Sequence, residues 1–131
     1  MEEMIRFIIL KNLEELDNYD SLDGLCFYFA NNIKADLEMM EIPVSLHNIE
    51  GEHYYLLAGE EYLIDPTYVQ FLPKKGEKTI VFEEFPAKIL EKSDRGREIL
   101  GNLLYNGYHK LKENDMDIYL SSFRLKEKRF K

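Results

Sequence analysis

Cysteine is almost absent from this chain: among 131 residues there is one, Cys26. A single thiol cannot form an internal disulfide, so we expect a fold that does not depend on oxidation, and it cannot build a thiolate zinc site alone. Histidine is scarce too, and of the three present we interpret His47 and His109 as packing or surface residues, which leaves His53. We therefore expect no metal and no cofactor.

Long apolar runs are missing as well. No stretch approaches the roughly 20 residues that a membrane-spanning helix needs, so a membrane is not an expected partner. Residues 1–10 are acidic before a short apolar run, which is the opposite of a secretory signal. We expect a cytoplasmic protein.

Positive charge is scarce in the first part of the chain. Residues 1–73 hold 15 acidic and 3 basic side chains, whereas residues 74–131 hold 10 acidic and 14 basic ones. The acidic part would repel phosphates, which disfavours nucleic acid as a partner. We interpret the basic stretch 124–131 as a solvated, frayed helix end, with contact to an acidic partner as the alternative. The oligomeric state is left open.

The spacing of apolar residues predicts one α+β domain over residues 1–131. Hydrophobic residues make up 45% of the chain, as in ordinary globular proteins, and the length suffices for a core without disulfides. Steps of three and four residues predict helices, and alternation predicts strands. Helices are expected at about 3–16, 24–40, 94–106 and 113–123, and strands at 42–49, within 53–65 and, more weakly, at 79–82. This order predicts helices around a short antiparallel sheet.

Two chemically active residues flank the hairpin expected at 53–65. Folding about Gly59 places residues whose numbers sum to about 118 opposite each other, which pairs His53 with Asp65. Asp65 ends an apolar strand, so its carboxylate is expected at a buried rim, where it needs a partner. The pair is interpreted either as an imidazole that a carboxylate orients for catalysis or as a structural hydrogen bond.

Cys26 falls in the first turn of the helix expected at 24–40, which Ser21 or Asp23 would cap. Free backbone N–H groups and the positive end of the helix dipole favour a thiolate there. A thiolate near an imidazole that is held by a carboxylate makes a nucleophile–base–orienter set. The alternative is that Cys26 is a small buried hydrophobic residue.

Four short stretches form a pattern in their order along the chain. They are Gly24-Leu25-Cys26, with Ala30 four residues after the cysteine, then Ile42-Pro43-Val44, then His53-Tyr54-Tyr55, and then residues 62–67. In this order they resemble the Gly-x-Cys-x-x-x-Ala, Gly-Ile-Pro-Ala, His-Ala-Trp and Trp-x-x-Asp-Pro-Thr stretches of the transglutaminase-like branch of the papain-like cysteine enzymes. The resemblance covers about a third of the chain.

Some positions depart from the family pattern. Glu41 replaces its glycine, and Tyr55 and Tyr62 stand where it has tryptophan. The glutamine that papain-type proteases carry before the cysteine is missing, and the one glutamine of the chain, Gln70, follows the aspartate. An oxyanion would have to be stabilised by backbone N–H groups near the cysteine, with Gln70, Tyr55 and Tyr62 as further oxyanion or substrate candidates.

The resemblance implies a papain-like core, in which a cysteine-bearing helix packs on a small antiparallel sheet, with further helices towards the C-terminus. It also implies Cys26 as nucleophile, His53 as base and acid, and Asp65 as the residue that orients the imidazole. We expect a cysteine-dependent enzyme that acts on amide or acyl bonds through a thioester.

Several outcomes stay open for such an enzyme. Hydrolysis by a peptidase or protein deamidase is favoured, and acyl transfer to an amine is the alternative with the same residues. A short domain leaves little material for a deep pocket, which favours a protein or peptide substrate. The chain can also be a non-catalytic binding module on the same scaffold, or an α+β domain in which the three residues only pack.

Overall fold

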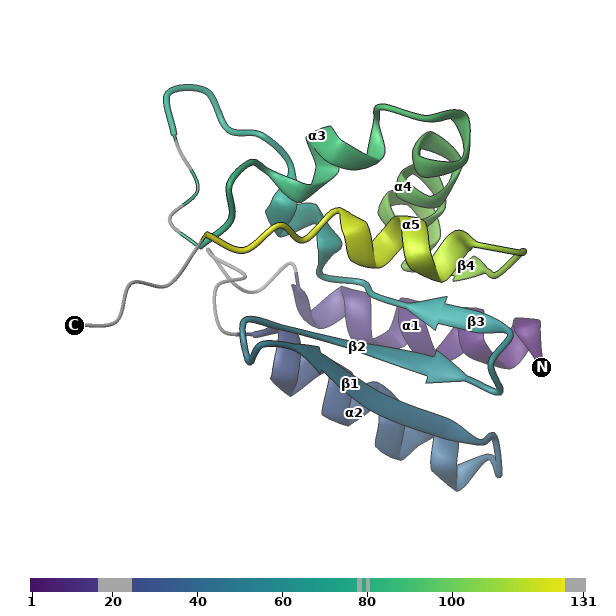
Figure 1. Cartoon of the computed structure of the whole chain (residues 1–131). Coiled ribbons are helices and arrows are strands. Elements are labelled where there is room, and N and C mark those ends of the chain that lie inside the picture. The colour runs from purple at the N-terminus through teal and green to yellow at the C-terminus, as the bar shows by residue number, and fades with distance from the viewer. Residues whose placement is uncertain (17–24, 78, 80, 127–131) are drawn as a thin grey trace.

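The computed structural model of the chain describes residues 1–16, 25–77, 79 and 81–126, and these form an α+β fold (Figure 1). In chain order the elements are α1 (Glu2–Leu16), α2 (Cys26–Met39), β1 (Val44–Ile49), β2 (His53–Ala58), β3 (Tyr62–Ile64), the 3-10 turn η1 (Tyr68–Phe71), α3 (Pro86–Leu90), α4 (Asp94–Asn106), β4 (Tyr108–Lys110) and α5 (Asp115–Ser121). Five helices and an antiparallel sheet of four strands, in the order β1-β2-β3-β4, thus make up the described part of the chain. The predicted α+β class is confirmed at this level.

The sheet separates two hydrophobic cores, because successive side chains of a strand point to opposite faces. One face packs against α1 and α2, and the other packs against η1, α3, α4 and α5. In Figure 1, α1 and α2 lie behind the strands, whereas α3, α4 and α5 gather on the other side of β3. On β2, Leu56 and Ala58 belong to the first core, and Tyr55 and Leu57 belong to the second.

The predicted hairpin forms, but its register differs from the expected one. Leu56 pairs with Ile64 and Ala58 pairs with Tyr62, so the numbers of paired residues sum to 120 rather than to about 118. The turn therefore contains three residues, 59–61, and Gly59 and Glu60 both have positive φ. Continued past the end of β3, this register puts Asp65 opposite Tyr55 and not opposite His53.

The helix boundaries follow the apolar spacing closely. α1 begins one residue before the expected start, and α2 begins at Cys26 with Leu25 at the N-cap and no side-chain cap. The expected caps, Ser21 and Asp23, lie outside the described residues. α4 has the expected bounds: Ser93 Oγ accepts a hydrogen bond from Gly96 N (3.0 Å), and Gly107 ends the helix with a φ of 79°.

Four short segments differ from the sequence prediction. Thr79, Val81 and Phe82 belong to no strand of the sheet, and Phe82 instead forms an isolated bridge with Leu125. The sheet is completed by β4, whose three residues are too few for a periodic pattern. Helix α3, with five residues, is also too short for a periodic pattern, and α5 is shorter than the expected 113–123.

No helix within the described ranges is both long and apolar enough to cross a membrane. Of the basic stretch 124–131, only residues 124–126 are described. There Lys126 N donates to Val81 O (2.9 Å) and Glu83 N donates to Arg124 O (2.7 Å), so these residues run beside 81–83.

Two glycines of α4 offer a matched test of how closely α3 packs against α4. A Cβ on Gly96 would overlap the carbonyl oxygen of Leu90, whereas one on Gly101 meets nothing within 4 Å. We predict that Gly96→Ala lowers the free energy of unfolding by about 3 kcal/mol, because overpacking forces the backbone to shift. Gly101→Ala should raise it by up to about 1 kcal/mol, because alanine favours the helix. Urea denaturation followed by circular dichroism measures both, and a Gly96→Ala variant as stable as the parent would contradict the close approach of α3 and α4.

Candidate active site

The structure brings Cys26, His53 and Asp65 together from three elements. Cys26 is the first residue of α2, His53 is the first residue of β2, and Asp65 directly follows β3. In Figure 1 the start of α2 and the start of β2 lie at the same end of the sheet, towards which β3 also runs. The expected position of the cysteine in the first helical turn is therefore confirmed.

His53 and Asp65 form a buried hydrogen bond despite the altered register. His53 Nε2 lies 2.8 Å from Asp65 Oδ2, and the two residues are 0% and 1% exposed. They are diagonal neighbours on one face of the sheet, within reach of an imidazole. Asp65 N donates to Gly107 O (2.9 Å), which fixes the backbone that carries the carboxylate. The pair that was expected by direct opposition is thus made by a diagonal contact.

The interaction with Asp65 raises the pKa of the His53 imidazole. Burial acts to lower that pKa, but the charge and hydrogen bond of Asp65, with smaller contributions from Cys26, raise it to about 9. The second ring nitrogen, Nδ1, is buried and has no hydrogen bond of standard geometry within the described residues. Since Nε2 is engaged by the carboxylate, Nδ1 is the nitrogen left to exchange a proton with a thiol.

The pKa of the Cys26 thiol is shifted downwards, opposite to the shift of His53. Cys26 is 8% exposed, and burial acts to raise its pKa. Interaction with His53 and a hydrogen bond from the backbone N–H of Tyr54 outweigh burial and the charge of Asp65, so that the pKa lies below its ordinary value. Shifts of opposite sign in a cysteine and a histidine favour a thiolate and an imidazolium side by side.

Aromatic rings enclose the imidazole. Phe71 meets it edge-on, with ring centroids 4.7 Å apart, and Phe123 stacks on it at 5.4 Å with 27° between the planes. Rings in both positions exclude water, which strengthens the electrostatic interaction between His53 and Asp65. Neither phenylalanine is indicated as a site residue by the sequence, although Phe123 falls within the helix expected at 113–123.

The three further candidates lie in different surroundings. Tyr55 is on the same face as Asp65, and burial together with the charge of Asp65 raises the pKa of its phenol. Tyr62 lies in the core on the opposite face, where its hydroxyl donates to Glu2 Oε1 (3.4 Å). Gln70 directs its amide to Thr67 O (3.0 Å). Of the three, Tyr55 is the one whose pKa is raised by the charge of Asp65.

A residue that the sequence did not indicate completes the site. The hydroxyl of Tyr119, on α5, donates to Asp65 Oδ2 at 2.6 Å, and Tyr119 is 0% exposed. Apolar spacing predicted the helix that carries Tyr119, but nothing local to α5 indicates that its hydroxyl reaches a carboxylate 54 positions away.

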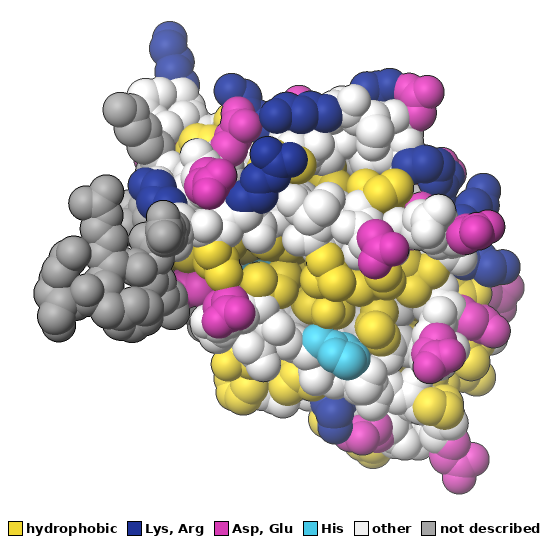
Figure 2. Space-filling view, in the orientation of Figure 1, with side chains coloured by type: hydrophobic (Ala, Val, Ile, Leu, Met, Phe, Trp, Pro, Cys, Tyr) yellow, Lys and Arg dark blue, Asp and Glu magenta, His cyan; other side chains and the backbone are white. Residues whose placement is uncertain are grey.

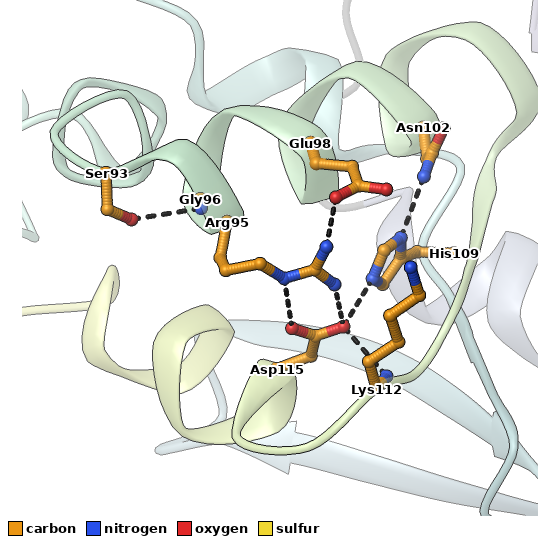
Figure 3. Close-up of polar contacts among 8 residues, drawn as sticks. All are labelled: Ser93, Arg95, Gly96, Glu98, Asn102, His109, Lys112 and Asp115. Atoms are coloured by element: carbon orange, nitrogen blue, oxygen red, sulfur yellow. Dashed lines mark hydrogen bonds and ion pairs between the residues drawn. The ribbon is translucent and has the colours of Figure 1, made fainter.

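A second buried His–Asp pair ties α4, β4 and α5 together (Figure 3). Asp115 accepts from His109 Nε2 (2.8 Å), from the backbone N of Lys112 (2.8 Å) and from two nitrogens of Arg95 (2.6 and 3.1 Å). Asn102 Nδ2 lies 2.9 Å from His109 Nδ1, which leaves Nε2 as the donor to the carboxylate. We call these residues the Asp115 clasp.

The described residues contain no group of three or more His, Cys, Asp and Glu side chains that could hold a metal ion. Comparison with known proteins gives no match: no family model fits the chain, and no curated protein or solved structure matches it. The chemistry must therefore be argued from the geometry of the site.

The Asp115 clasp should stabilise the fold in a pH-dependent way. Burial alone would raise the pKa of Asp115, but the bonds from Arg95, His109 and Lys112 outweigh it and lower the pKa. A lowered pKa contributes stability above the ordinary pKa of about 4, and this contribution is lost as the pH falls. We predict that Asp115→Ala costs about 3 kcal/mol of unfolding free energy at pH 7 and less at pH 3.

Asp117→Ala, at an exposed position of the same helix, is the matched control and should change the unfolding free energy by less than about 0.5 kcal/mol. Urea denaturation at both pH values measures the difference between the two variants. An effect of Asp115→Ala that is small, or equal at pH 7 and pH 3, would show that the clasp does not stabilise the fold.

Proposed function

We propose that the protein is a cysteine-dependent enzyme that acts on amide or acyl bonds through a thioester on Cys26. One observation carries the proposal: Cys26, the first residue of a helix, interacts with a buried imidazole whose Nε2 is bonded to a carboxylate. The opposite pKa shifts of Cys26 and His53 support it. The same three residues support a transglutaminase-like core as the finer description of the fold.

The reaction follows from the positions of the protons. The Cys26 thiolate attacks the carbonyl carbon, and the oxygen takes the negative charge. As this tetrahedral intermediate collapses, the bond from carbon to the leaving nitrogen breaks, and His53 Nδ1–H donates its proton to the leaving amine. Asp65 holds Nε2 and favours the imidazolium before this transfer.

The thioester is then cleaved by a second nucleophile. His53, now neutral, accepts a proton from water or from an amine through Nδ1 as that nucleophile attacks the carbonyl carbon. The carbon–sulfur bond breaks and regenerates the thiolate, with a carboxylic acid or a new amide as product. Hydrolysis and acyl transfer share every residue, and we favour hydrolysis, with acyl transfer as the alternative.

A protein or peptide is the proposed substrate class. Hydrophobic side chains gather in a band across the middle of one face, at the level of β2 and β3, with acidic side chains near it (Figure 2). Ile49 and Leu57, on β1 and β2, are only partly buried. Small metabolites bind mostly in deep pockets. An apolar surface of this kind therefore fits an extended polypeptide chain better than a small metabolite.

A binding module is the second candidate, and the enclosure of the site favours it. Cys26 is 8% exposed, and Phe71 and Phe123 cover the imidazole. If Cys26, His53 and Asp65 stay covered, they would contribute to packing but would not catalyse a reaction. Reactivity of the thiol separates the two candidates.

The first prediction about function concerns alkylation of Cys26. With iodoacetamide, the pH midpoint of the alkylation rate should lie well below the free-thiol value of about 8.5. His53→Ala should return it to the ordinary range and slow alkylation at pH 6.5 by at least roughly tenfold. Cys26→Ala is the control for background labelling, and His47→Ala, a histidine on β1, should leave the midpoint unchanged. A midpoint at the ordinary value in the parent would exclude the enzyme.

A second prediction concerns the covalent intermediate. p-Nitrophenyl acetate should leave one acetyl group on Cys26, visible by intact mass and removed by hydroxylamine, and none on Cys26→Ala. Loss of the acetyl group in buffer alone supports hydrolysis, and its transfer to added glycine ethyl ester supports acyl transfer. Cleavage of an amide substrate should decline as the pH rises through about 9, because its leaving amine needs the proton of the His53 imidazolium, which is lost there. A parent protein that is never acetylated would favour the binding module.

A further inference from the structure

The carboxylate of Asp65 is held at one oxygen by two donors. Oδ2 accepts from His53 Nε2 (2.8 Å) and from the hydroxyl of Tyr119 (2.6 Å), whereas Oδ1 is buried without a hydrogen-bond partner among the described residues. With His53 alone, the carboxylate could rotate about its own bond and the imidazole would follow it. The second donor, from a different element, removes this freedom.

Tyr119 is itself held rigidly. It is 0% exposed, and its ring lies against Tyr55 at 5.3 Å, Tyr68 at 5.9 Å and Phe123 at 5.2 Å between centroids. Burial and the charge of Asp65 raise the pKa of its phenol well above the ordinary value, so the hydroxyl remains a donor at any working pH.

The helix that carries Tyr119 is anchored at one end and covers the site at the other. Asp115, Tyr119 and Phe123 are spaced four residues apart and therefore lie on one side of α5 and its continuation. Asp115 is fixed to α4 and β4 by the Asp115 clasp (Figure 3), and Phe123 stacks on His53. One helical side thus joins a structural anchor, the donor to Asp65 and the cover of the imidazole.

We infer that Tyr119 is a positioning residue of the site: its hydroxyl fixes the Asp65 carboxylate in the orientation that receives His53 Nε2. This inference rests on the proposed function, because it assigns Tyr119 a part in keeping the imidazole directed at Cys26. The titratable groups around His53 are Cys26 on α2, Asp65 after β3 and Tyr119 on α5, with Tyr55 and Tyr68 close enough to feel the charge of Asp65.

Tyr119→Phe tests the inference, with Tyr68→Phe as the matched control. Both variants remove one buried hydroxyl from the same aromatic cluster, but the hydroxyl of Tyr68 contacts Ser122 Oγ (3.2 Å) and not Asp65. Tyr119→Phe should move the pH midpoint of Cys26 alkylation by iodoacetamide up by about one pH unit, which is about tenfold slower alkylation at pH 6.5. Tyr68→Phe should leave the midpoint unchanged. An unchanged midpoint in Tyr119→Phe, or an equal shift in both variants, overturns the inference.

Proton NMR keeps this test independent of turnover. In the parent protein the Nε2 proton of His53 and the hydroxyl proton of Tyr119 should be slow to exchange and close enough for a nuclear Overhauser effect, since both donate to one oxygen. In Tyr119→Phe the Nε2 resonance should broaden by exchange, and in Tyr68→Phe it should persist. A sharp Nε2 resonance in Tyr119→Phe, or no Overhauser effect in the parent, overturns the inference even if a variant folds poorly.

The two proposals fail separately. An ordinary alkylation midpoint in the parent excludes the proposed enzymatic function. The Nε2 resonance of His53 still decides whether Tyr119 positions Asp65. A lowered midpoint in the parent that Tyr119→Phe leaves in place keeps the enzyme and removes the role of Tyr119.

Discussion

A buried carboxylate is the constraint on which this structure depends. Asp65 is 1% exposed, and among the described residues no lysine or arginine pairs with it. A carboxylate in that position is tolerated only if donors surround it. The start of β2 must therefore bring His53, and α5 must bring Tyr119, to the end of β3. These demands fix how the second core packs on the sheet, and they leave Nδ1 of the imidazole without a hydrogen-bond partner within the described ranges.

The two buried His–Asp pairs show why only one of them is proposed as a site. Asp115 is bound by a bidentate arginine, so its charge is balanced without His109, whose Nδ1 is engaged by Asn102. Among the described residues Asp65 has no such cation, so its charge acts on His53 and raises the pKa of the ring. In both pairs a buried carboxylate is hydrogen-bonded to an imidazole. The difference is that Nδ1 of His53 has no hydrogen-bond partner in the described part of the chain and that the ring interacts with the thiol of Cys26.

The sequence predicted the parts of the fold that depend on local pattern. Apolar spacing located α1, α2 and α4, because this signal lies within one element. The hairpin was expected, but its three-residue turn was not, because positive φ at Glu60 cannot be read from the sequence. His53 and Asp65 were still paired, since a diagonal contact tolerates that shift. The role of Tyr119 depends on how α5 packs against β3, which no local pattern encodes.

The central claim is that Cys26 and His53 share a thiolate and an imidazolium held by Asp65. The most direct measurement is a titration of the thiolate by its ultraviolet absorbance, taken as the difference between the protein and Cys26→Ala. The account predicts a midpoint well below the free-thiol value of about 8.5. A midpoint at or above that value would contradict it, because the imidazole would then not stabilise the thiolate.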